Sequence, residues 1–319
     1  MAIQILILLL GLAMVIAGAD VLVDGASAIA RKAGLSEFLI GMTIVGIGTS
    51  MPELVVSFTG ALKGSSDIAI GNVVGSNIFN VLLILGVTAL VNPVAISQEN
   101  KRRDIPVNIL VTVLLVLFGM SRTLLGLGSG DTISAWKGGV FLLLFVLYML
   151  MSFKTGKAGE DVDPAAPARK LWVAVLMVLG GLAGLVFGGD LFVDSACGIA
   201  RSAGLSEKFV AITILACGTS LPELVTCVVA AAKKKGALAL GNIIGSNISN
   251  ILLILGSSAL VCPLSFANIK AVDIGVLALS SVVLLTSAWT GRNNKIGRGD
   301  GSVFLLLFAA YMAYLFMTI

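Results

Sequence analysis

Residues 48–53 read Gly-Thr-Ser-Met-Pro-Glu, and residues 218–223 read Gly-Thr-Ser-Leu-Pro-Glu. Each copy lies inside a long apolar run. A charged side chain at bilayer depth costs roughly 3 kcal/mol or more on insertion scales, so Glu53 and Glu223 are predicted to belong to a functional site. Because proline has no N–H, Pro52 and Pro222 each leave a carbonyl four residues earlier without its helical partner. Carbonyls, hydroxyls and carboxylates together form a set of hard oxygen ligands, which suits Na⁺ or Ca²⁺ better than a soft metal.

The composition indicates a membrane protein. Hydrophobic residues make up 58% and charged residues 12% of the 319, and the mean hydropathy is +1.07, which excludes an ordinary soluble domain. The net charge of +4 does not indicate a nucleic-acid partner, because the basic residues lie in short loops. The chain has no histidine, which excludes imidazole proton relays and most zinc chemistry.

Ten apolar runs are long enough to span a bilayer. They lie at about residues 3–30, 38–62, 68–91, 105–121, 133–153, 171–200, 209–232, 237–261, 271–290 and 301–318. A polar stretch with Gly, Pro and acidic residues separates the fifth run from the sixth. We therefore expect an all-α polytopic membrane protein, with a first five-helix repeat at 1–153, a linker at 154–170 and a second five-helix repeat at 171–319.

The two halves of the chain repeat each other. Residues 18–93 align with residues 188–263 without a gap, at an offset of 170, and about 41 of the 76 pairs are identical. Each half holds five runs, an odd number, so the second half should enter the membrane from the opposite side. The sequence thus predicts an inverted-topology repeat, an arrangement in which secondary transporters hold their substrate at the midplane between the halves.

Loop charge predicts the orientation of the ten spans. With the N-terminus outside, the inward loops contain 15 Lys and Arg residues and the outward loops contain six. The positive-inside rule then places both termini outside and the linker at 154–170 in the cytoplasm. Trp136, Trp172 and Trp289 lie at span ends, as interfacial anchors do.

A second duplicated stretch accompanies the first. Residues 71–80 read GNVVGSNIFN, and residues 241–250 read GNIIGSNISN. The second, sixth and tenth positions of each copy are spaced i, i+4 and i+8, which puts them on one face of a helix. We expect the sixth and tenth positions to be ion ligands: Ser76, Asn80, Ser246 and Asn250. The other amides either bind ions or hold membrane helices together: Asn72, Asn77, Asn242 and Asn247.

Other polar residues have structural interpretations. Ser36 and Ser206 are each expected to cap the helix that follows. Four aspartates, two in each half, are expected to form hydrogen bonds or ion pairs that orient neighbouring helices: Asp20, Asp24, Asp190 and Asp194. A structural role for Glu53 and Glu223 is less favoured, because every basic residue lies at a span end or in a loop. Two unpaired carboxylates facing each other would repel, and a bound cation removes that conflict.

The duplicated Gly-Thr-Ser-x-Pro-Glu and Gly-Asn-x-x-Gly-Ser-Asn-x-x-Asn motifs resemble those of the cation/calcium exchanger superfamily, and within it the compact prokaryotic sodium/calcium exchangers. The likeness covers essentially the whole chain. It implies a secondary antiporter of the prokaryotic cell membrane, functional as a monomer in the lipid bilayer, with Ca²⁺ and Na⁺ as transported substrates. Spans one and six would slide against a bundle of eight helices for alternating access. Neither an enzymatic activity nor a cofactor is implied.

The same resemblance implies which residues bind the ions. Glu53 and Glu223 would bind Ca²⁺ together, with carbonyls near Gly46 and Ala216. Na⁺ would use the same glutamates with the neighbouring hydroxyls: Thr49, Ser50, Ser76, Thr219, Ser220 and Ser246. The central site would be lined by Asn80 and Asn250. Relatives that also carry K⁺ have an aspartate in this motif, so the asparagines favour K⁺ independence. The family's exchange of three Na⁺ for one Ca²⁺ would be electrogenic.

Three other functions fit the sequence less well. A Ca²⁺/H⁺ antiporter is the closest alternative, and Glu53 and Glu223 would then carry its protons. An ion channel is disfavoured because the internal repeat already completes a site within one chain. An intramembrane protease would need paired aspartates or a Ser-His arrangement at depth. The chain also has no nucleotide-binding loop, as expected of a secondary transporter.

Overall fold

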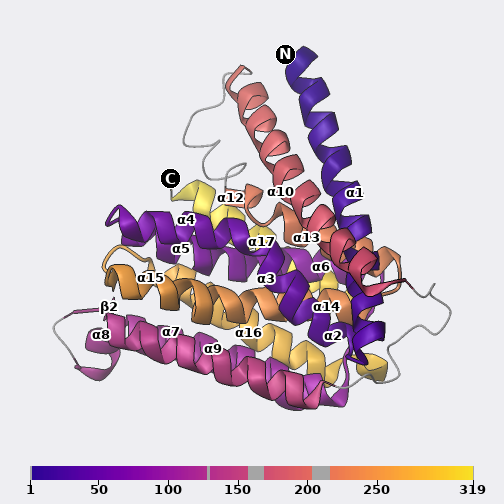
Figure 1. The fold of residues 1–319 in the computed structure, drawn as a ribbon. Coiled ribbons are helices and arrows are strands. Elements are labelled where there is room, and N and C mark those ends of the chain that lie inside the picture. Colours follow the sequence, from indigo (N-terminus) through magenta and orange to yellow (C-terminus); the bar gives the residue numbers. More distant parts are fainter. Residues whose placement is uncertain (1, 128–129, 157–168, 203–215, 319) are drawn as a thin grey trace.

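Two long helices, α1 (Ala2–Ala33) and α10 (Leu171–Ser202), lie side by side and project from the rest of the molecule (Figure 1). The computed structural model describes residues 2–127, 130–156, 169–202 and 216–318. Glycines bring the two helix backbones into contact: a Cβ built on Gly18 would lie 2.8 Å from the carbonyl oxygen of Gly181. Small residues of this kind are typical of closely packed membrane helices.

The other helices form a bundle below this pair (Figure 1). Those of the first half are α2 (Glu37–Ile40), η1 (Gly41–Val45), α3 (Gly46–Thr49), α4 (Met51–Leu62), α5 (Ser66–Ile78), η2 (Phe79–Leu85), α6 (Gly86–Val91), η3 (Asn100–Asp104), α7 (Ile105–Gly119), α8 (Ser121–Leu125) and α9 (Ala135–Thr155). Those of the second half are α12 (Ala216–Gly218), α13 (Leu221–Ala232), α14 (Gly236–Ser249), η5 (Asn250–Leu255), α15 (Gly256–Val261), α16 (Ala271–Thr290), η6 (Arg292–Asn294) and α17 (Arg298–Met317). The expected all-α class is confirmed.

Four two-residue strands tie loops of the two halves together. Strand β1 (Val94–Ala95) pairs antiparallel with β4 (Lys295–Ile296), and β2 (Thr132–Ile133) pairs antiparallel with β3 (Leu264–Ser265). Each pair joins a loop of the first half to a loop of the second, so the halves are fastened to each other outside their helices.

The sequence repeat is visible in the elements themselves. Helices α4 and α13 begin at equivalent positions of the two halves, as do α6 and α15. A π-helical stretch follows the second motif in each half, η2 after α5 and η5 after α14. Such turns are rare and occur frequently at functional sites, and nothing in the apolar periodicity of these runs predicted them.

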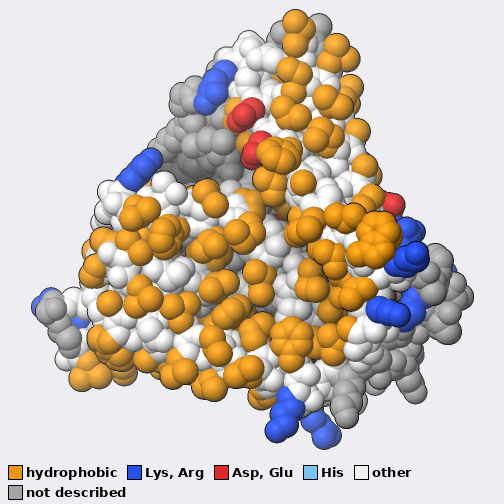
Figure 2. Space-filling model, in the orientation of Figure 1, with side chains coloured by type: hydrophobic (Ala, Val, Ile, Leu, Met, Phe, Trp, Pro, Cys, Tyr) orange, Lys and Arg blue, Asp and Glu red, His pale blue; other side chains and the backbone are white. Residues whose placement is uncertain are grey.

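The outer surface suits a bilayer. Seven of the described helices are long and apolar enough to cross a membrane, or eight if the bent pair Glu37–Thr49 and Met51–Leu62 is one span. Hydrophobic side chains cover most of the face in Figure 2, and Lys and Arg lie at its margins. Two predicted runs fall outside this test: the run at 209–232 is described only from Ala216, and the run at 105–121 forms the 15-residue helix α7. The number of ten spans remains a prediction.

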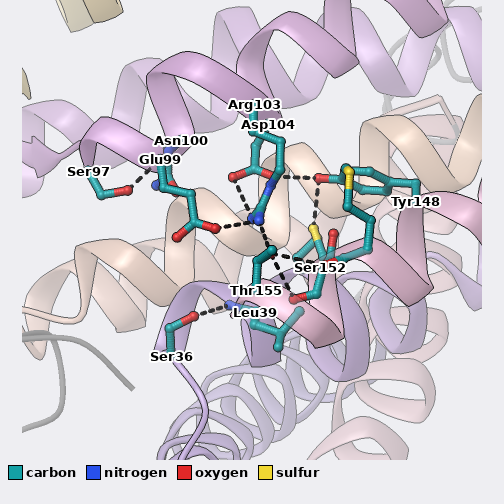
Figure 3. A network of polar contacts seen from close by, with 12 residues as sticks. Ser36, Leu39, Ser97, Glu99, Asn100, Arg103, Asp104, Tyr148, Ser152 and Thr155 are labelled. Atoms are coloured by element: carbon teal, nitrogen blue, oxygen red, sulfur yellow. Dashed lines mark hydrogen bonds and ion pairs between the residues drawn. The ribbon is translucent and has the colours of Figure 1, made fainter. Parts of the chain in front are cut away.

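A polar network joins the start of α7 to the end of α9 (Figure 3). Arg103 Nε donates to Asp104 Oδ1 at 2.8 Å, and its guanidinium also contacts Glu99 and Thr155. Tyr148 on α9 donates to the same Asp104 oxygen at 2.9 Å, and Asp104 is fully buried. This network fixes the ends of two helices next to the bundle core.

The predicted cap at Ser36 is confirmed, and Ser206 lies outside the described residues. The hydroxyl oxygen of Ser36 accepts a hydrogen bond from the N–H of Leu39 at 3.2 Å, at the start of α2 (Figure 3). The backbone N–H of Ser36 itself donates to the carbonyl of Gly156 at 3.2 Å, beyond the end of α9. The entry to the first broken span is therefore held by both a side chain and a backbone contact.

Candidate ion-binding site

Each Gly-Thr-Ser-x-Pro-Glu motif breaks its helix at the serine. The helical segments before and after Ser50 meet at an angle of 48°. Ser50 has φ −82° and ψ 9°, and Ser220 at the equivalent place has φ −90° and ψ 6°, both outside the helical range. The proline two residues further on cannot donate a backbone hydrogen bond, which accounts for the break. Both serines are buried, so each break delivers a hydroxyl to the interior.

The two breaks exchange hydrogen bonds with each other's glutamate. Ser50 Oγ donates to Glu223 Oε1 at 3.1 Å, and Ser220 Oγ donates to Glu53 Oε1 at 3.1 Å. Ser76 Oγ adds a longer contact of 3.4 Å to the same oxygen of Glu53. Both glutamates are almost completely buried. The two motifs, far apart in the sequence, therefore form one site across the interface of the halves.

The asparagines of the second motif form a matching pair of bonds. Asn80 Nδ2 donates to Asn247 Oδ1 at 3.0 Å, and Asn250 Nδ2 donates to Asn77 Oδ1 at 2.9 Å. Asn77 Nδ2 in turn donates to the carbonyl of Asn247 at 3.1 Å. For Asn77 and Asn247 the sequence left two roles open, ion binding and helix packing, and these bonds are those of packing residues. They fix the orientation of the amides at Asn80 and Asn250.

Four carboxylate and amide oxygens at this interface have no hydrogen-bond partner although they are buried: Glu53 Oε2, Glu223 Oε2, Asn80 Oδ1 and Asn250 Oδ1. A buried acceptor without a partner is costly, and it needs an explanation such as a bound ion. Each of these side chains uses its other polar atom for a bond to the opposite half, which leaves the second oxygen available. Carboxylate and amide oxygens are the ligands that hard cations prefer.

The two glutamates have no cationic partner among the described residues. The ion pairs found there involve other acids, such as Glu37 with Lys235 at 3.0 Å and Asp104 with Arg103 at 2.8 Å. In the same part of the chain no group of three or more His, Cys, Asp or Glu side chains gathers as a metal site. The site consequently combines two carboxyl groups with neutral oxygens and, among the described residues, has no fixed cationic partner.

The remaining predicted ligands lie around this centre. Thr49 Oγ1 donates to Asn242 Oδ1 at 3.2 Å, and Ser246 Oγ donates to the carbonyl of Gly46 at 3.2 Å. Thr219 Oγ1 is buried without a partner. Ala216 begins α12, one turn before the second break. The structure thus brings the hydroxyls of both motifs to the same interface.

Asn72 behaves as a packing residue. Its Nδ2 donates to the backbone carbonyl of Glu53 at 3.2 Å and to Ser57 Oγ at 3.0 Å. Asn242 binds Thr49, as described above, and its Nδ2 donates to Cys227 Sγ at 3.2 Å. Each asparagine holds the helix that carries a glutamate against the helix that carries the second motif.

A cavity of about 980 Å³ approaches the site from one side. Its lining includes Pro52, Thr219 and Pro222, next to the two breaks, and also Asp190 and Asp194 of α10. Most of its other lining residues are apolar, among them Met51, Val55 and Ile68. The cavity therefore lies next to both breaks and reaches two acidic side chains of α10.

Comparison with known proteins decides the family. The model of the family described as "Sodium/calcium exchanger protein" matches residues 3–154 and 173–317. The chain belongs to this family. It is 38% identical to CaxA of Alkalimonas amylolytica, with 99% of each chain covered, and 34% identical to the sodium/calcium exchanger MaX1 of Methanosarcina acetivorans, with 98% of this chain and 99% of the relative covered. Solved structures of the sodium-calcium exchanger NCX_Mj are also similar. The one soaked with 2.5 mM Na⁺ and 0.1 mM Ca²⁺ has a TM-score of 0.84 at 34% identity and covers 98% of each chain.

Membership of the sodium/calcium exchanger family identifies the chain as a multi-pass membrane transport protein rather than a catalytic enzyme, in agreement with its apolar helices. The resemblance inferred from the duplicated motifs is therefore confirmed. Two features of the site were not assigned from the sequence: the orienting role of Asn77 and Asn247, and the serine-to-glutamate exchange between halves. The 170-residue repeat contained a signal for both: Asn77 and Asn247 are equivalent positions that bind each other, and the bond from Ser50 to Glu223 has its symmetric counterpart in the bond from Ser220 to Glu53.

Proposed function

We propose that this exchanger carries Na⁺ and Ca²⁺ in opposite directions by alternating access, with both ions bound as substrates and no cofactor. The observation that supports this most directly is the pair of buried glutamates, each with one unpartnered oxygen, together with the buried and unpartnered amide oxygens of Asn80 and Asn250. MaX1 and NCX_Mj, which match the whole chain, are both described as sodium/calcium exchangers.

The charge of the site explains how the two ions compete. Glu53 and Glu223 contribute two negative charges, so one Ca²⁺ neutralises the site and three Na⁺ leave it with a net charge of +1. Both loads need the same carboxylates, and the entry of one displaces the other. Exchange of three Na⁺ for one Ca²⁺ is then electrogenic, and the membrane potential contributes roughly 2.3 kcal/mol per net charge per 100 mV.

The architecture we propose is ten transmembrane helices in two inverted-topology repeats, at 1–153 and 171–319, joined by a cytoplasmic linker at 154–170. The duplicated elements and the exchange of bonds between the two glutamate motifs support a pseudo-two-fold axis through the site. The excess of basic residues in the inward loops supports external termini. The cell membrane of a prokaryote and a functional monomer complete the proposal, because each chain holds a whole site.

The side chains at the centre favour Na⁺ coupling without K⁺. Asn80 and Asn250 supply neutral amide oxygens, so the site has two carboxylates rather than three. A third carboxylate would provide charge for an additional monovalent ion. A Ca²⁺/H⁺ antiporter is the alternative, since Glu53 and Glu223 are protonatable, but the hydroxyls that surround them are ligands that a proton does not need.

The test is ⁴⁵Ca²⁺ uptake into proteoliposomes that are loaded with Na⁺ and diluted into Na⁺-free buffer. We expect uptake only with the outward Na⁺ gradient. It should be faster when the interior is made positive, because each cycle exports one net charge. Matched vesicles without Na⁺ but with a pH gradient provide the control. Uptake driven by the pH gradient alone would make the protein a Ca²⁺/H⁺ antiporter and refute Na⁺ coupling.

A further inference from the structure

A basic residue at the end of α13 holds helix α1. Lys233 Nζ lies 2.7 Å from Asp20 Oδ1 and 2.7 Å from Asp24 Oδ1, and it also donates to the carbonyl of Asp20 at 3.2 Å. Burial lowers the pKa of Lys233, but the hydrogen bonds and charges of the two aspartates outweigh it and raise the pKa above its ordinary value. We call these three residues the inner triad, because loop charge places the turn after α13 inside.

The repeat places the same three residue types in the other half. At the offset of 170, Lys63 corresponds to Lys233, and Asp190 and Asp194 correspond to Asp20 and Asp24. Within the described residues, no ion pair or hydrogen bond joins Lys63 to either aspartate, and all three are exposed. Asp190 and Asp194 instead line the 980 Å³ cavity. We call Lys63, Asp190 and Asp194 the outer triad.

Equivalent residues are thus paired in one half and separate in the other. In an inverted repeat, the opposite-facing state is obtained when the halves exchange their conformations. A contact that the present state makes in one half only should therefore break when the protein faces the opposite side, and the equivalent contact should form in the other half. We propose that the two triads alternate: Lys63 pairs with Asp190 and Asp194 in the inward-facing state, while Lys233 releases Asp20 and Asp24. This inference rests on the alternating access and inverted topology proposed above.

The helix packing gives the alternation a mechanical basis. Helices α1 and α10 touch along their glycines, with a Cβ on Gly11 only 2.8 Å from the carbonyl of Gly188. The inner triad fastens this pair to the turn after α13, and the outer triad would fasten it to the equivalent turn after α4. Closing the outer triad would bring Lys63 to Asp190 and Asp194, which line the cavity.

The exposure of the inner triad suits a contact that breaks in every cycle. The side chains of Lys233, Asp20 and Asp24 are 26%, 55% and 35% exposed. Ion pairs at this degree of exposure are weak, so breaking one costs little and shifts the balance of states only modestly. A fully buried pair would instead trap the protein in one state. The expected effects of neutralising either lysine are therefore about two- to fivefold.

The first test asks whether the outer triad closes. Lys63→Cys and Asp194→Cys are combined in a variant in which the native cysteines are replaced by serine (Cys197, Cys217, Cys227 and Cys262). We expect a short bifunctional thiol reagent to cross-link the pair and stop exchange. The two single-cysteine variants serve as controls and should keep exchanging. Failure to cross-link under turnover, in vesicles that still exchange Ca²⁺, would overturn the proposal.

The second test needs no cysteine replacement and measures apparent affinity on each face. A protein in which the binding-competent state is less populated binds its ligand with a proportionally weaker apparent affinity. Lys63→Gln should therefore raise the KM for Ca²⁺ at the inner face about two- to fivefold, and Lys233→Gln should raise it at the outer face. Lys234→Asn, beside Lys233 at a φ of 60° that suits asparagine, is the matched control. Equal changes on both faces, or none, would indicate a purely structural role.

Reversing the charges of Lys63 and Asp194 distinguishes ion pairing between them from other effects of replacing the lysine. Lys63→Asp should impair inner-face affinity, and adding Asp194→Lys should restore it, because the pair is re-formed with opposite signs. No restoration would overturn the pairing. The cross-linking result does not depend on which ions are carried: if the protein transported Ca²⁺ with H⁺ instead of Na⁺, the proposed function would fail while the cross-link between the two cysteines would still form.

Discussion

Replacing Glu53 with glutamine removes one charge from the site and almost nothing else. The amide oxygen of the introduced side chain can accept the same hydrogen bonds from Ser220 and Ser76 that Glu53 Oε1 accepts now. What is lost is the negative charge and the unpartnered second oxygen. Removing one member of a buried, closely coupled charge set costs roughly 3–5 kcal/mol, and about 1.4 kcal/mol corresponds to a factor of ten. We therefore expect Glu53→Gln to weaken Ca²⁺ binding at least about 100-fold and to abolish Na⁺-dependent uptake at micromolar Ca²⁺.

The measurement combines ⁴⁵Ca²⁺ uptake with thermal unfolding in detergent. Ca²⁺ should raise the unfolding midpoint of the native protein, as a ligand of the folded state does, and should leave that of Glu53→Gln unchanged. Without Ca²⁺ the variant should be at least as stable as the native protein, because the repulsion between Glu53 and Glu223 is removed. Glu37→Gln is the matched control: Glu37 is also buried, but it pairs with Lys235 outside the site. Uptake by Glu53→Gln within a fewfold of the native rate would refute the assignment of this residue.

Three further predictions concern the same centre. Ser50→Ala removes the hydroxyl that binds Glu223 at 3.1 Å. Because hydrogen bonds to charged groups contribute about 1.5–3 kcal/mol, the KM for Ca²⁺ should rise about 10- to 100-fold, as measured by concentration-dependent uptake. Asn80→Ala removes an unpartnered oxygen and the bond to Asn247. We expect isothermal titration to show a loss of Ca²⁺ affinity of about tenfold. An unchanged affinity would contradict a ligand role for Asn80. Omitting K⁺ from both sides should leave Na⁺-dependent Ca²⁺ flux unchanged, and a flux that disappears would refute K⁺ independence.

Much of the site was predictable because its residues violate the rules of a membrane span. An acid and a proline within an apolar run are each costly, so the presence of Glu53 and Pro52 indicated a broken helix with a function. The structure places the break at Ser50, with a 48° bend. The repeat at an offset of 170 then identified the partner motif, because a second acid and proline in an apolar run indicate that both copies belong to the same site. The energetic cost of single residues and the internal symmetry of the chain were sufficient to identify this part of the site.

Contacts between distant segments were not predictable in the same way. Lys233 was assigned only to a loop, and its contacts with Asp20 and Asp24 join residues more than 200 positions apart. Tyr148 donates to Asp104 at 2.9 Å in the first half, and Tyr311 donates to Asp273 at 2.9 Å in the second. These two pairs do not keep the 170-residue offset, since loop lengths differ beyond the aligned region, so sliding the sequence against itself does not reveal them.

The pattern of bonds at the glutamates explains why the site is suited to exchange rather than to permanent binding. Each glutamate is held by neutral hydroxyls from the other half, and no lysine or arginine among the described residues neutralises it. A fixed cationic partner would have satisfied the carboxylates and left nothing for a mobile ion to supply. Hydroxyls differ, because a serine oxygen that donates to a carboxylate can also present its lone pairs to a cation. Serines from both breaks therefore hold the site together without a fixed counter-charge. In the proposed function they would add ligands when several Na⁺ replace one Ca²⁺, so that one set of residues would serve both loads.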